Sequence, residues 1–105
     1  MSSVFSIAAS GMAAAQRRME VSASNVANAS NDDVAAAFAA LRIDQVDVTG
    51  GGTGTKVRTD SGPAAHVDLA KEAVQQLVAR YSFAANANVL RAEAKMQKAL
   101  FDALA

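Results

Sequence analysis

The chain has 105 residues with no Cys, no Trp and a single Pro, so it is at most one small domain without disulfides or a cysteine-based metal site. Ten basic residues balance ten acidic ones, which gives no reason to expect binding to nucleic acid or a membrane surface. No apolar run is long enough for a transmembrane segment, and the N-terminus lacks the pattern of a secretory signal.

The first predicted element is a helix from Val4 to about Ala29. Apolar and small residues recur there in alternating steps of three and four, which is the pattern of a coiled-coil-like seam. Gly11 costs about 1 kcal/mol in a helix relative to Ala, so it is either simply tolerated or marks the close approach of another backbone. The seam consists of Phe5, Ala8, Met12, Ala15, Met19, Ser22 and Val26.

The end of this helix reads "SASNVANAS" (22–30), which is rich in poor helix formers. Two interpretations of Asn25 and Asn28 remain open. Their amides can bond to groups of neighbouring helices, or they can simply fray the end of the helix, where Asn is common.

The middle of the chain predicts a β-hairpin over residues 41–59, with "TGGGTGT" (49–55) as its turn. The preceding Ala-rich stretch 32–41 is ambiguous between a helical turn and an extended linker. An isolated two-stranded hairpin is marginally stable, so we expect it to need support from the helices.

A second, longer helix is predicted from Val67 to Leu104, with Asp68 as its N-cap. The eleven-residue spacing of Val74, Ala85 and Met96 suits a nearly straight helix. We expect each helix to bury one stripe and to leave further apolar residues for other neighbours. The stripe of this helix consists of Val74, Val78, Tyr81, Ala85, Val89, Ala92, Met96 and Leu100.

The fold class predicted from these elements is mainly α, with two long terminal helices forming a coiled-coil-like hairpin and a small β-hairpin in the middle. Three regions follow: an N-terminal helix (1–30), a linker with the β-hairpin (31–66), and a C-terminal helix (67–105).

Catalytic patterns are not found in the sequence. Lys56 follows Thr55 and precedes Val57, which does not match a phosphate-binding loop. His66 is the single histidine, so a zinc ligand set or a His-Cys dyad is excluded. We therefore expect no enzymatic activity, no catalytic residue, no cofactor, no metal and no small-molecule substrate.

Both ends of the chain resemble the axial rod and hook proteins of the bacterial flagellum. "IAASGMAAAQRRMEVSASNVANAS" (7–30) is similar to their helical signature through Ser10-Gly11 and the Asn-rich element from Asn25 to Asn28. Residues 67–100 resemble the second signature through Asp68-Leu69, Phe83 and Ala85-Asn86. Within the family, "ASNVANA" is most similar to the proximal rod proteins, although the middle of this chain is shorter.

This resemblance implies a non-enzymatic rod subunit that contributes to flagellum assembly and motility. Such a protein would leave the cell through the flagellar type III export apparatus, without a cleaved signal peptide, and lie in the periplasmic part of the basal body. Its partners would be other copies of itself and other rod proteins, not nucleic acid. The alternative is a freestanding helical-hairpin paralogue that acts as an adaptor or chaperone for partner helices.

The resemblance also implies which residues contact neighbouring subunits. We expect these to be the apolar residues of both helices together with the close-approach glycine and the amides. The predicted interface consists of Phe5, Gly11, Met12, Met19, Asn25, Val26, Asn28, Val74, Phe83, Asn86, Met96 and Leu100.

Overall fold

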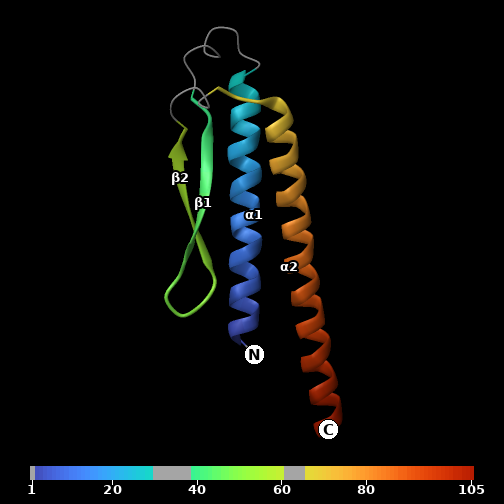
Figure 1. The fold of residues 1–105 in the computed structure, drawn as a ribbon. Coiled ribbons are helices and arrows are strands. Elements are labelled where there is room, and N and C mark those ends of the chain that lie inside the picture. Colours follow the sequence, from blue (N-terminus) through green and yellow to red (C-terminus); the bar gives the residue numbers. More distant parts are fainter. Residues whose placement is uncertain (1, 30–38, 61–65) are drawn as a thin grey trace.

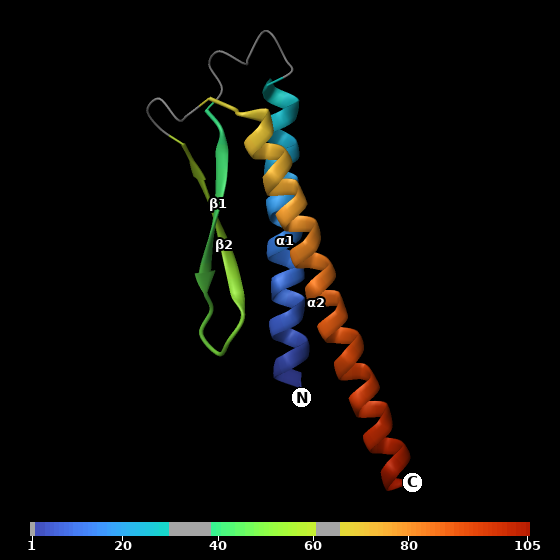
Figure 2. The ribbon, with the colours of Figure 1, turned by 45° about the vertical axis from the view of Figure 1, so that its right-hand side comes forward.

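The computed structural model describes residues 2–29, 39–60 and 66–105. Its elements are α1 (Ser2–Ala29), β1 (Leu41–Asp47), β2 (Thr53–Thr59) and α2 (Leu69–Leu104). The helices run antiparallel (Figures 1 and 2), and α1 lies between the hairpin and α2 (Figure 1). The predicted fold class is therefore confirmed. The undecided residues 32–38 and most of the predicted linker lie outside the described residues.

The predicted N-cap of α2, Asp68, is confirmed, and the helix begins at Leu69, two residues later than the predicted start at Val67. The carboxylate of Asp68 accepts hydrogen bonds from the backbone N–H groups of Ala70 (3.0 Å) and Lys71 (3.3 Å), which have no partner within the helix itself. From this cap the helix continues for 36 residues, or about 54 Å at 1.5 Å per residue. His66 lies exposed just before it.

The two strands pair antiparallel, from Leu41 opposite Thr59 to Asp47 opposite Thr53. The predicted turn was too long, because Thr53 to Thr55 belong to β2. The reversal instead uses Gly50, Gly51 and Gly52, whose φ angles are 94°, 101° and 98°. L side chains rarely adopt these angles, so the glycine run fixes where the chain turns.

Small residues form the contact between the helices. Ala8, Ala15 and Ser22 of α1 are buried, as is Ala79 of α2. Gly11 lies against Asn86, since a Cβ at Gly11 would stand 2.6 Å from the Asn86 Nδ2. One interpretation of Gly11 was that another backbone approaches it closely. The group that approaches Gly11 is instead the side chain of Asn86, from the same chain.

The expectation that α2 buries its apolar stripe against its partner was wrong. The large residues of that stripe are exposed, and the buried residues of α2 are Glu72, Ala79 and Glu93. These three are spaced by multiples of seven, so they share one helical face. The side that approaches α1 closely carries small and polar residues, and the bulky apolar side chains point elsewhere.

Helix α2 is longer than α1 and extends past its N-terminal end (Figure 1). Gly11 lies against Asn86 and Asn25 bonds to Glu72, so continuing this register places Ser2 level with about Lys95. The last turns of α2 therefore have no α1 residue beside them. The resulting molecule is elongated, with a longest dimension of 64 Å.

Candidate functional site

Asn25 connects three elements of the fold. Its side chain is fully buried. Its Oδ1 accepts from the N–H of Leu41 at 2.8 Å, and its Nδ2 donates to the C=O of the same residue at 2.8 Å. Nδ2 also donates to Oε1 of Glu72 at 3.0 Å. The amide thus pairs with Leu41, the first residue of β1, through the same N–H and C=O groups that a neighbouring strand would use. Its third bond, to Glu72, connects β1 and α1 with α2.

A buried ion pair completes this cluster. Glu72 is fully buried in the first turn of α2, and its Oε1 also accepts from a guanidinium nitrogen of Arg42. The Nε of Arg42 donates to Asp60 at 2.9 Å. We call Asn25, Arg42, Asp60 and Glu72 the polar junction. Removing one partner of such a buried pair costs about 3–5 kcal/mol, so the junction fixes how the hairpin meets the helices.

The charges of the junction reinforce one another. Burial opposes the charge of Arg42, but its bonds to Glu72 and Asp60 outweigh that effect and raise the pKa of Arg42 above its ordinary value. Desolvation likewise disfavours the ionised carboxyl of Asp60. The guanidinium groups of Arg58 and Arg42 nevertheless lower the pKa of Asp60. Asp60 is thus held in its ionised form.

Ser10 attaches the far end of the hairpin to α1. Its Oγ accepts from the N–H of Thr53 at 3.0 Å and donates to the C=O of Ile7 at 2.7 Å. A Cβ at Gly52 would stand only 2.8 Å from this Oγ. The Ser10-Gly11 pair of the rod-like signature therefore has two structural roles: Ser10 holds the hairpin, and Gly11 admits Asn86 of α2.

The large apolar residues of the predicted α2 stripe form a surface that the chain leaves uncovered. We call them the outer stripe. Their exposed fractions range from 44% for Val78 to 68% for Tyr81. An apolar row of this length on a helix is typical of a surface that packs against another molecule. The outer stripe consists of Val74, Val78, Tyr81, Val89, Met96 and Leu100.

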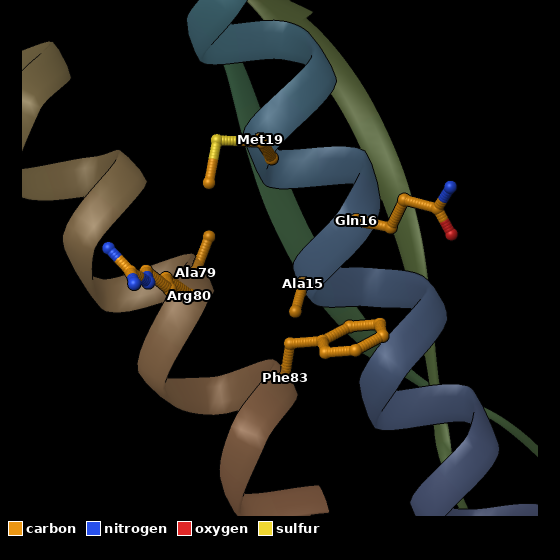
Figure 3. Close-up of a pocket in the computed structure, with 6 residues that line it drawn as sticks. All are labelled: Ala15, Gln16, Met19, Ala79, Arg80 and Phe83. Carbon is orange, nitrogen blue, oxygen red and sulfur yellow. The ribbon is translucent and has the colours of Figure 1, made fainter. Parts of the chain in front are cut away.

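A second apolar surface is a groove between the two helices. Figure 3 shows the ring of Phe83 reaching across to α1, with Ala15 and Met19 of α1 facing α2. This part holds about 390 Å³. A neighbouring hollow of about 270 Å³ shares Met19 and Arg80 with it, so the two form one interhelical groove. Its lining consists of Ala15, Gln16, Met19, Ala73, Gln76, Leu77, Ala79, Arg80 and Phe83.

The predicted interface residues fall into three groups. Asn25 is buried in the polar junction, and Gly11 and Asn86 contact each other. Asn28 is half-buried and donates to the C=O of Ser24 within α1 at 2.8 Å. The others lie half-buried on α1 or exposed on α2, namely Phe5, Met12, Met19 and Val26, and Val74, Phe83, Met96 and Leu100. Their contact with another subunit stays a prediction.

Sequence reasoning missed Arg42, Asp60 and Glu72. None of the three stands in a sequence motif that marks a functional residue. Glu72 and Arg42 are 30 positions apart, and Arg42 and Asp60 are 18 apart. No local sequence spacing indicates these ion pairs, because Arg42, Asp60 and Glu72 meet only when the hairpin packs against the helices.

Comparison with known proteins points in one direction. The sequence model of the family described as "Flagella basal body rod protein" matches residues 5–30, which is nearly all of α1. The match supports a relation to that family, whose proteins are structural components of the flagellar basal body. No curated protein matches the chain. Among the described residues, neither helix combines the length and apolar character needed to cross a membrane.

Proposed function

We propose that this protein is a non-enzymatic structural subunit of the bacterial flagellar basal-body rod, which assembles through its two terminal helices. The outer stripe is the observation that carries the proposal. It gives α2 a continuous apolar surface that is exposed to water in the single chain. Burying each of its large side chains against a partner would contribute about 1.5–3 kcal/mol of favourable free energy. A subunit that packs among other helices would cover it.

The family match on α1 supports the same proposal from the other helix. Within that family we propose a relation to the proximal rod protein FlgC, with a shortened central region. We infer a place in the periplasmic rod, reached through the flagellar type III export apparatus, with copies of itself and other rod proteins as neighbours. On this proposal the interface comprises the predicted residues that lie at the surface, namely Phe5, Met12, Met19, Val26, Asn28, Val74, Phe83, Met96 and Leu100. Asn25, Gly11 and Asn86, which the sequence also predicted there, have their contacts within the chain.

The experiment is to delete the gene in its host, score swimming, and search purified basal bodies for the protein by mass spectrometry. Loss of swimming, with the wild-type protein present in basal bodies, would support a rod subunit. Normal swimming, with the protein absent from basal bodies, would contradict it.

Complementation with two variants tests the outer stripe. Met96 is 62% exposed, so Met96→Asp should leave the fold intact but place a charge in the interface and abolish incorporation. Met96→Leu keeps the apolar volume and should restore swimming. Circular dichroism of both purified variants checks that the helices are retained.

A second candidate function is a freestanding helical-hairpin adaptor or chaperone. The polar junction favours it, because Asn25 finds its hydrogen-bond partners inside the chain and the three elements are bonded without a neighbour. A stable monomer with folded helices in sedimentation and circular dichroism, together with normal swimming of the deletion strain, would favour the adaptor.

A further inference from the structure

We infer that the interhelical groove receives a helix from a different protein, and that this helix carries an apolar ridge edged by carboxylates. The inference rests on the proposed function in treating the helices as assembly surfaces, and goes beyond it by assigning the chemistry of one partner. The groove is concave and lies between two helices, so it fits a third helix better than a flat lipid surface.

The floor of the groove is apolar. Ala15 and Met19 come from α1, and Ala79, Leu77 and Phe83 come from α2. Leu77 is 50% exposed and Phe83 41%, so both can lose further surface to a partner. A ridge of apolar side chains would fill this floor.

One cation, Arg80, stands on the α2 rim of the groove. Arg80 lines both parts of the groove, and Figure 3 shows its side chain at the outer edge, directed away from α1. Beyond the groove, α2 continues with Arg91, Lys95 and Lys98 at steps of eleven, four and three residues, which keeps them on the same side of the helix as Arg80. Among the described residues, no carboxylate lies within ion-pair distance of Arg80, Arg91 or Lys95.

A second copy of the chain does not offer the complementary charge from its helices. Glu72 and Glu93 of α2 are buried. The remaining carboxylates of the two helices are Glu20, which lies 3.8 Å from Arg17, and Asp102, which lies 2.9 Å from Lys98. Placing the rim of one copy beside that of another would bring like charges together, which costs binding energy. The groove therefore selects a different, acidic helix.

The test uses the full chain and two synthetic helical peptides. One has a leucine ridge edged by glutamate, and its twin has lysine at each glutamate. Fluorescence anisotropy should show at least tenfold tighter binding of the glutamate peptide, and this preference should weaken as salt rises, since rim charges are screened. Equal binding, or no binding of either peptide, overturns the inference.

Charge reversal locates the binding surface. Arg80→Glu should weaken binding of the glutamate peptide about tenfold, whereas Lys56→Glu, an equal charge change on the exposed hairpin, should leave it within about twofold. Reversal of Arg80, Arg91 and Lys95 together should shift the preference to the lysine peptide. Equal effects of Arg80→Glu and Lys56→Glu would overturn the inference.

Two further arms exclude other occupants. Self-association of the chain in sedimentation that Arg80→Glu abolishes would assign the groove to a second copy. Binding to phosphatidylglycerol vesicles without binding to the glutamate peptide would assign the surface to lipid. Either result overturns the inference. The proposed function is tested by a different experiment: absence of the wild-type protein from basal bodies would contradict it, independently of the result of the peptide-binding measurements.

Discussion

The amide of Asn25 shows how much one side chain can determine in this fold. Asn is a poor helix former because its side chain competes for backbone hydrogen bonds. In this fold the Asn25 amide bonds to groups outside its own helix, namely the N–H and C=O of Leu41 and Oε1 of Glu72. The intrinsic cost in α1 is therefore offset by the attachment of the hairpin.

The two asparagines near the end of α1 predict contrasting effects. Asn25→Ala should lower the free energy of unfolding by about 2–4 kcal/mol, because it leaves buried groups of Leu41 and Glu72 without a partner. Asn28→Ala is the matched control. It loses a local bond to Ser24 but gains helix propensity, so its effect should stay within about 0.5 kcal/mol. Urea unfolding measures both, and equal effects would contradict the role given to Asn25.

Asp60 predicts a dependence of stability on pH. Its pKa is lowered in the folded chain, so folding favours the ionised form, and this stability is present above the ordinary aspartate value of 3.8. It is lost as the pH falls below that value toward the lowered pKa. The stability difference between wild type and Asp60→Asn should therefore be larger at pH 7 than at pH 3 in urea unfolding. A difference that does not change with pH would contradict the prediction.

Small residues decide how the two helices pair. The α1 surface toward α2 carries Ala8, Gly11, Ala15 and Ser22, which permit close approach, and Asn86 occupies the space beside Gly11. The Asn86 side chain also donates to the C=O of Ser82 at 2.9 Å within its own helix. An added methyl group at Gly11 would displace this amide, so the glycine is retained for packing despite its cost to the helix.

Gly11 and Asn86 should be coupled in a double-mutant cycle. Gly11→Ala alone should destabilise the chain, since its Cβ would stand 2.6–2.8 Å from three atoms of the Asn86 amide. In the Asn86→Ala background the same substitution should stabilise the chain by about 0.5–1 kcal/mol, because only the gain in helix propensity remains. Thermal and urea unfolding of the four proteins give the coupling energy. Additive effects would mean that the amide moves aside without cost.

The whole molecule is elongated, with the hairpin on one side of α1 and α2 on the other (Figure 1). Much of its apolar surface faces outward. The outer stripe continues into the last turns of α2, where Phe101 is 72% exposed and Leu104 is 77% exposed. These turns contribute surface for a partner and little to the packing of the single chain.

Truncation separates these two contributions. Removal of residues 96–105 should change the free energy of unfolding by less than about 1 kcal/mol, because this segment has no α1 residue beside it, and should abolish incorporation into basal bodies. Removal of residues 2–9 is the contrasting variant. It deletes the buried Ala8 and also Ile7, whose side chain lies beside Gly51 of the hairpin turn, and should destabilise the chain clearly. Comparable stability losses in both would contradict the assignment of the last turns to assembly.

The sequence by itself determined the elements: alanine-rich periodic segments formed the two helices, Asp68 set the start of α2, and the glycine run placed the hairpin turn. These depend on local backbone preferences that neighbouring residues already fix. Only the tertiary structure decided which face of α2 meets α1 and which partners Asn25 and Glu72 have. The two helices approach closely only where their side chains are small, and the polar groups that bond across this contact are far apart in sequence. The bulky apolar stripe of α2, which has the strongest helical period, therefore lies on the exposed side of the helix.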